Sequence, residues 1–114
     1  MRLALAGLIA LAAAPASAET GQTIFEESCG ECHTLAAAST EAPTLRGVVG
    51  RKIASLPDFQ YSDGLKAKGG VWTEAELSAF LANPQTYAPG TTMYVIVPSE
   101  DDRKALIDYL KTAK

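Results

Sequence analysis

The stretch Cys29-Gly30-Glu31-Cys32-His33 decides the fold of this 114-residue chain. It is a C-x-x-C-H motif, the pattern through which a haem is attached covalently to a protein. The two cysteines lie about one helical turn apart, so both sulfurs can reach the two vinyl groups on one edge of a porphyrin. His33 follows at once and can direct its imidazole at the iron. The motif predicts one haem c, held through Cys29 and Cys32 and ligated by His33.

The two cysteines have two other interpretations. A C-x-x-C pair in an exported protein can form a disulfide or a thioredoxin-like redox pair. A redox pair belongs beside a βαβ pattern, which this sequence lacks. A zinc site needs further cysteine or histidine ligands. The chain holds two cysteines and one histidine, all inside the motif, so haem attachment is the interpretation that we adopt.

The second axial ligand is expected at Met93. It follows a Pro89-Gly90 turn in a segment without helical periodicity, far along the chain from the haem motif. A lone methionine can also fill a gap in a core. Ligation by histidine and methionine raises the reduction potential of a haem and suits electron transfer. We therefore predict His33 and Met93 as the two metal ligands.

The first 18 residues are typical of a secretory signal peptide. Arg2 gives a positive start, residues 3–14 form an apolar run, and Ala16-Ser17-Ala18 supplies the small residues of a cleavage site. A membrane anchor is the alternative, but the run is shorter than the about 20 residues that a spanning helix needs. We expect cleavage after residue 18, a domain over residues 19–114 with no membrane span, and a periplasmic location.

The rest of the sequence predicts an all-α fold of about four helices. Residues 34–61 contain several glycines and prolines and little periodicity, and a loop of that length is unusual unless it wraps a cofactor. Residues 93–97 favour a strand by propensity, but we interpret them as an extended connection. The expected helices cover Gly21–Cys32, a short segment after Ser62 that stops at Gly69-Gly70, a segment from the Thr73 cap to Pro84, and a segment after the Ser99 cap.

Together these motifs resemble the class I c-type cytochromes, over nearly all of residues 19–114. The resemblance implies a small cytochrome c fold whose helices and long loops wrap one haem. It also implies a soluble one-electron carrier rather than an enzyme. The matching stretches are Gly21 and Phe25, Cys29 to Thr34, Pro43-Thr44-Leu45-Arg46-Gly47, Gly50-Arg51-Lys52, Phe59-Gln60-Tyr61-Ser62-Asp63, Trp72, Asn83-Pro84, Tyr87, Pro89-Gly90-Thr91-x-Met93 and Leu106-Ile107-x-Tyr109-Leu110-Lys111.

The resemblance also implies roles for individual residues. The Pro43 carbonyl is expected to accept a hydrogen bond from Nδ1 of His33, which fixes the tautomer of a ligand. Gly21 and Phe25 are expected where the first helix crosses the last. Buried haem propionates need hydrogen-bond donors, and four residues match the donor positions: Arg51, Tyr61, Trp72 and Thr91.

The sequence departs from the family pattern at three places. Phe80 replaces a tyrosine that commonly reaches the methionine sulfur, and Leu65 replaces a common asparagine. The third departure is the loss of the lysines that often surround the haem edge, because residues 83–100 contain no lysine or arginine. Residues 19–114 contain nine basic and thirteen acidic residues, a net charge of −4, which argues against nucleic acid as a partner.

These charges predict redox partner proteins with a neutral or basic docking face, and we expect a monomer. One alternative to a free carrier is a haem subunit bound within a dehydrogenase or reductase complex. Another is a haem enzyme or gas sensor. That activity would need an open iron face and an acid–base group above it, and no second histidine exists to provide the group.

Overall fold

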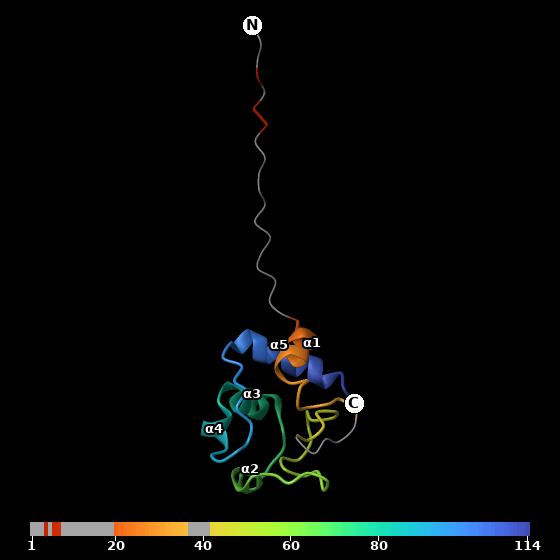
Figure 1. Cartoon of the computed structure of the whole chain (residues 1–114), viewed down its shortest axis with the longest axis vertical. Helices are drawn as coiled ribbons and strands as arrows, with labels where there is room; N and C mark the ends of the chain where they lie inside the picture. The colour runs from red at the N-terminus through yellow and green to blue at the C-terminus, as the bar shows by residue number, and fades with distance from the viewer. Residues whose placement is uncertain (1–3, 5, 8–19, 37–41) are drawn as a thin grey trace.

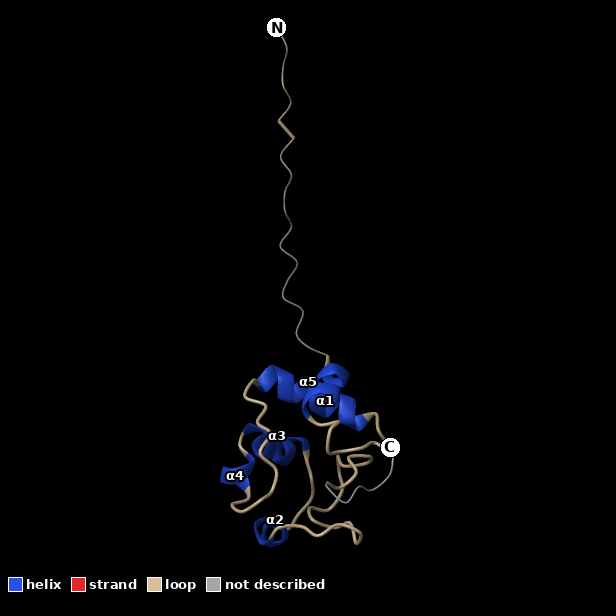
Figure 2. Cartoon of the chain, in the orientation of Figure 1, coloured by secondary structure: helices blue, strands red, loops and turns tan. Residues whose placement is uncertain are grey.

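The structure is a computed structural model that describes residues 4, 6, 7, 20–36 and 42–114. In this described part, α1 and α5 cross at one end of the domain and α2 lies at the other (Figure 1). No strand occurs in the same residues, which confirms the all-α prediction (Figure 2). The helices are α1 (Gly21–Ser28), α2 (Asp63–Lys68), α3 (Glu74–Ala82), α4 (Pro84–Tyr87) and α5 (Glu100–Lys111).

A side chain caps the amino-terminal end of each of these helices. Such a cap satisfies one of the backbone N–H groups that have no partner within the helix. The predicted caps Thr73 and Ser99 are confirmed, since they accept from the N–H groups of Glu76 and Asp102. The spacing Thr73-x-x-Glu76 also predicts a capping box, in which the Glu76 carboxylate accepts from the N–H of Thr73. Instead, that N–H donates to the carbonyl of Val71, and the Glu76 carboxylate accepts the hydroxyl proton of Tyr87 at 2.5 Å, which links α4 to α3.

Two helix boundaries differ from the prediction. We expected the first helix to reach Cys32, but α1 ends at Ser28. The N–H groups of Cys29 and Gly30 both donate to the carbonyl of Phe25 at 2.8 Å, which closes the helix and starts a turn. Pro84 follows the end of α3 as predicted, but it also begins α4, because proline is favourable at the first helical position.

The helices α1 and α5 cross in close backbone contact. A Cβ on Gly21 would collide with the backbone carbonyl of Ala105 and would lie 2.7 Å from Cβ of Tyr109. Phe25 packs its ring 5.9 Å from that of Tyr109. Leu106 of α5 is fully buried beside this contact. The expected crossing is therefore confirmed, and it requires glycine for steric reasons.

Residues 93–97 form the extended connection that we expected and not a strand. Within the described residues, no helix is both long and apolar enough to pass through a bilayer. The predicted signal peptide falls mainly on residues 1–3, 5 and 8–18, which lie outside the described part of the chain. Its cleavage therefore stays a prediction.

We predict that Gly21→Ala destabilises the protein. The added methyl group must push α1 away from α5, and overpacking of this kind costs about 1–3 kcal/mol. Chemical denaturation followed by circular dichroism measures the loss. Glu27→Ala, which changes an exposed residue of the same helix, should stay close to wild type. Equal midpoints for Gly21→Ala and wild type would show that the crossing tolerates a side chain.

Candidate haem-binding site

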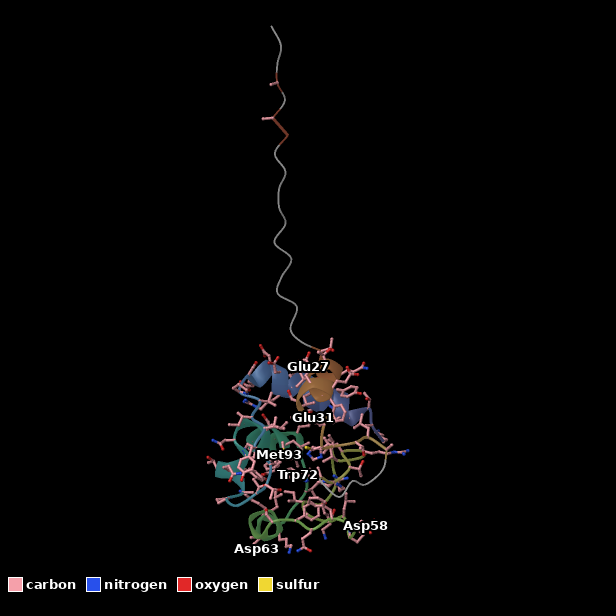
Figure 3. All side chains as sticks on the ribbon, viewed as in Figure 1. Glu27, Glu31, Asp58, Asp63, Trp72 and Met93 are labelled. Carbon is pink, nitrogen blue, oxygen red and sulfur yellow. The ribbon has the colours of Figure 1, made fainter. Side chains whose placement is uncertain are left out.

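A cavity of about 350 Å³ occupies the centre of the described domain. It is bounded by the haem motif, α3, α5 and the loops on either side of α2, and Met93 and Trp72 point into this region (Figure 3). All nine residues predicted for the site line the cavity, although they come from six separate stretches of sequence: Cys29, Cys32, His33, Pro43, Arg51, Tyr61, Trp72, Thr91 and Met93.

The two cysteines lie at one side of the cavity and differ in exposure. Cys29 is buried with 5% of its surface exposed, whereas Cys32 is exposed, and neither forms a disulfide. Burial raises the pKa of the Cys29 thiol to about 11. Both thiols, which form no disulfide, are therefore available for attachment to a porphyrin edge.

His33 is held in one orientation by the backbone. Its Nδ1 lies 2.7 Å from the carbonyl oxygen of Pro43. A carbonyl can only accept, so Nδ1 carries the proton and, in the neutral ring, Nε2 keeps its lone pair. The pKa of His33 is lowered mainly by burial, against the effect of the Pro43 hydrogen bond and with a smaller contribution from Arg51. The neutral ring is the form that binds a metal.

The position of Pro43 is itself fixed by neighbouring hydrogen bonds. The N–H of Leu45 donates to the carbonyl of Thr34 at 2.8 Å, and the hydroxyl of Thr44 donates to the same carbonyl at 3.1 Å. These bonds join the segment after His33 to the segment after Pro43. The predicted contact between His33 and Pro43 is thus supported by hydrogen bonds that join their two segments.

Two of the predicted propionate donors are brought together by a short antiparallel contact. The N–H of Trp72 donates to the carbonyl of Arg51 at 2.8 Å, and the N–H of Gly50 donates to the carbonyl of Trp72 at 2.8 Å. The Arg51 guanidinium is half-buried and donates to the carbonyls of Thr44 and Arg46. A charged donor and an indole N–H therefore come from segments about twenty residues apart.

The other two predicted donors come from different loops. Tyr61 accepts a hydrogen bond from the N–H of Leu56 at 3.3 Å, which leaves its own hydroxyl proton to donate. Thr91 is 4% exposed, and its hydroxyl accepts from the N–H of Met93 at 3.3 Å. Both side chains line the same cavity as Arg51 and Trp72.

The walls of the cavity are mostly apolar. Phe80 and Leu65, the two departures from the family pattern, both line it, and the Phe80 ring packs 5.2 Å from Trp72 and 5.5 Å from Tyr87. Further apolar residues line the cavity that the sequence did not assign to it: Leu45 and Val48 of the loop, and Leu77, Leu81, Leu106 and Leu110 of α3 and α5. An apolar cavity with two sulfurs, an oriented imidazole, a thioether and a few convergent donors fits a haem.

The fold and this donor set define a small all-α protein that encloses a covalently attached porphyrin. Comparison with protein families matches residues 18–114 to cytochrome c. The chain is 45% identical to a cytochrome c of Tetrahymena pyriformis over 96 residues, which cover 83% of this chain and 87% of that protein. It is 40% identical to cytochrome c type-1 of Ascaris suum over 95 residues, 82% and 85% of the two chains.

A bacterial relative is the cytochrome c-type cyt cy of Rhodobacter capsulatus, 36% identical over 96 residues, which are 83% of this chain and 48% of that protein. The chain therefore belongs to the cytochrome c family. It carries one haem c bound covalently through Cys29 and Cys32, and it is an electron carrier rather than an enzyme.

Covalent attachment predicts that denaturing electrophoresis leaves the haem on the chain, because thioether bonds survive unfolding. A double variant with Cys29→Ala and Cys32→Ala should lose the haem stain, while Ser28→Ala, at an exposed neighbouring position, should keep it. Extraction of the haem from the wild-type protein by acidified acetone would contradict a covalent bond.

Proposed function

We propose that this cytochrome c is a soluble one-electron carrier in which His33 and Met93 are the axial ligands of the iron. Bound haem supplies an Fe(III)/Fe(II) couple. The chain itself supplies an imidazole, a thioether and an apolar cavity. The observation that carries the proposal is that His33 and Met93, sixty residues apart in sequence, line one cavity together with both cysteines.

Further support comes from the polar groups of the cavity. The Pro43 carbonyl orients His33 and increases the basicity of its other ring nitrogen. Arg51, Tyr61 and Trp72 would donate to the propionates, whose burial without donors would be costly. The titratable side chains that line the cavity besides the cysteines and His33 are Glu31, Arg51, Tyr61 and Tyr94. Such a lining contains no second histidine to act as a distal acid–base group.

The ligation proposal is tested by Met93→Ala. Ferric iron bound to a thioether gives a weak absorption band at the red end of the visible spectrum, and the variant should lose it. The ferrous variant should bind carbon monoxide, because the sixth position is then open. Val95→Ala, in the same loop, should keep the band and exclude carbon monoxide. An unchanged spectrum in Met93→Ala would remove the methionine ligand from the proposal.

The mouth of the cavity is mostly uncharged, and this supports a docking face without the usual lysines. Its exposed lining residues include one carboxylate, that of Glu31, and no lysine. Tyr94 is 75% exposed and Val95 and Ile96 are also exposed, so an apolar surface adjoins the mouth. Apolar residues at the centre of an interface supply most of its affinity, and charges at the rim direct the approach of a partner.

The lysines of the helices also contribute little positive field towards partners. Lys104 and Lys111 lie within 3.6 Å of the carboxylate of Asp108, and Lys66 lies 3.9 Å from Asp63. Lys68 lies over the ring of Tyr87 on the side of a surface groove that is separate from the cavity. We therefore propose redox partners whose docking face is neutral or basic.

This docking proposal predicts the dependence of the electron-transfer rate on salt. Stopped-flow reaction with an acidic-faced oxidase should be slow at low ionic strength and should not slow further when salt is added. Thr92→Lys adds a cation at the cavity mouth, so that variant should react faster at low salt and lose this advantage as salt rises. A steep fall in the wild-type rate with salt would show that the protein docks through positive charge.

We also propose that the protein is exported to a periplasm after removal of residues 1–18. The support is the sequence of that segment and the position of the first helix. Thr20 caps α1 two residues after the proposed cleavage site, so cleavage would leave the described fold intact. The relatives include eukaryotic and bacterial proteins, and the proposed compartment rests on the amino-terminal segment.

A further inference from the structure

The segment that carries Met93 is held to the domain by few backbone contacts. At its start, the N–H of Thr91 donates to the carbonyl of Ala88 at 3.0 Å. At its end, the N–H of Val97 donates to the carbonyl of Leu81 at 2.9 Å. Between them, residues 92–96 make no backbone–backbone hydrogen bond within the described part of the chain. Side chains must therefore hold this segment in place.

The end of the segment is held by Arg103 of α5. Its guanidinium donates to the carbonyls of Val97 and Pro98 at 3.0 and 2.9 Å, and to the hydroxyl of Ser78 on α3 at 3.0 Å. These bonds fix the exit of the segment against two helices. They lie beyond Tyr94 and Ile96, which are exposed, and they do not reach Met93.

The start of the segment is held by Gln85 of α4. Its side-chain nitrogen Nε2 donates to the carbonyl of Thr91 at 2.7 Å and to the carbonyl of Met93 at 3.2 Å. The two acceptors determine the orientation of the amide, because only its NH₂ group can bond to two carbonyl oxygens. One side chain therefore joins Thr91, at the start of the segment, to Met93 itself.

The short helix that carries Gln85 is anchored at both ends. The four-residue helix α4 begins with Pro84, which is fully buried, and Asn83 caps it by accepting from the N–H of Thr86 at 3.1 Å. At its other end, Tyr87 is buried and donates to Glu76 of α3. Gln85 is itself half-buried between these anchors. A donor mounted on such a support can restrict the backbone that it contacts.

We propose that Gln85 is a positioning residue that holds the backbone of Met93 so that its thioether stays on the iron. This inference rests on the proposed ligation by Met93. The Gln85 side chain provides two hydrogen bonds to a segment whose backbone makes none of its own between residues 92 and 96. The exposed residues 94–96 are then the part of the segment that can move away from the domain. Loss of the two donors should increase the fraction of molecules in which Met93 has left its place.

The test uses the ferric holoprotein with Gln85→Glu, which has the same shape but presents a carboxylate to two carbonyl oxygens. Imidazole competes with a thioether for the iron, so its affinity reports how readily Met93 leaves. We expect that affinity to rise about tenfold, the effect of losing about 1.4 kcal/mol of hydrogen bonding. The Met93 N–H donates to the Thr91 hydroxyl, so exchange of this amide, followed by NMR or mass spectrometry, should become faster by a similar factor.

Two controls separate the possible causes. Thr86→Ala changes an exposed side chain of the same helix and should match wild type in both measurements. Gln85→Leu removes the donors without adding charge and should behave as Gln85→Glu does, which provides a second variant if the carboxylate prevents folding. A lower melting temperature without a change in imidazole affinity or in amide exchange would overturn the proposal, since it would indicate a merely structural side chain.

Met93→Ala distinguishes failure of this inference from failure of the proposed ligation. If Met93→Ala binds imidazole more tightly than wild type while Gln85→Glu does not, then Met93 is a ligand and Gln85 does not position it. If Met93→Ala has the wild-type affinity, the ligation is wrong. In that case, exchange of the Met93 N–H in Gln85→Glu still decides whether the Gln85 side chain holds this part of the segment, with unchanged exchange counting against it.

Discussion

The contact between α1 and α5 is the constraint on which the rest of the structure depends. Gly21 allows the two backbones to approach until a methyl group would not fit between them. α1 leads directly into Cys29, and α5 presents Leu106 and Leu110 to the same cavity. The crossing therefore sets the distance between the haem motif and one wall of the site. If α1 and α5 separated, the distance between the cysteines and the wall formed by α5 would increase.

The opposite side of the cavity depends on side chains more than on regular structure. Arg51 and Trp72 meet through a short antiparallel contact, whereas Met93 lies in a segment that Gln85 and Arg103 hold from two ends. The support of the Met93 segment can be tuned by single substitutions, because Gln85 and Arg103 each hold it through one side chain. These supports explain how a protein with few helices can bring His33 and Met93, sixty residues apart in sequence, into one site.

Much of this arrangement could be predicted from the sequence, because local chemistry determined it. The caps Thr73 and Ser99 stand where their patterns indicated, and the haem motif identified the cofactor. The contact of His33 with Pro43 came from family resemblance. These features depend on residues that are close in sequence or that belong to a known pattern, so no three-dimensional information was needed to find them.

The features that sequence reasoning missed depend on hydrogen bonds that the residue types alone do not specify. The early end of α1 results from two N–H groups that share the carbonyl of Phe25. No residue pattern that we used predicts this shared acceptor. In the sequence, Gln85 was notable only as one of the residues in a stretch that lacks the lysines common around the haem edge of the family. Its bonds to Thr91 and Met93 exist because α4 turns back towards the following loop. A polar residue directly after the buried Pro84 was the one available signal.

The central claim is that the cavity seats a haem between His33 and Met93, and proton NMR of the reduced holoprotein tests it most directly. A methyl group held over the face of a porphyrin is strongly shielded by the ring current. The account predicts that the Met93 methyl resonance of the ferrous protein lies far upfield of every other methyl signal, and that it disappears in a sample whose methionine methyl groups are deuterated. A Met93 methyl resonance at the ordinary position of a methionine would contradict the account.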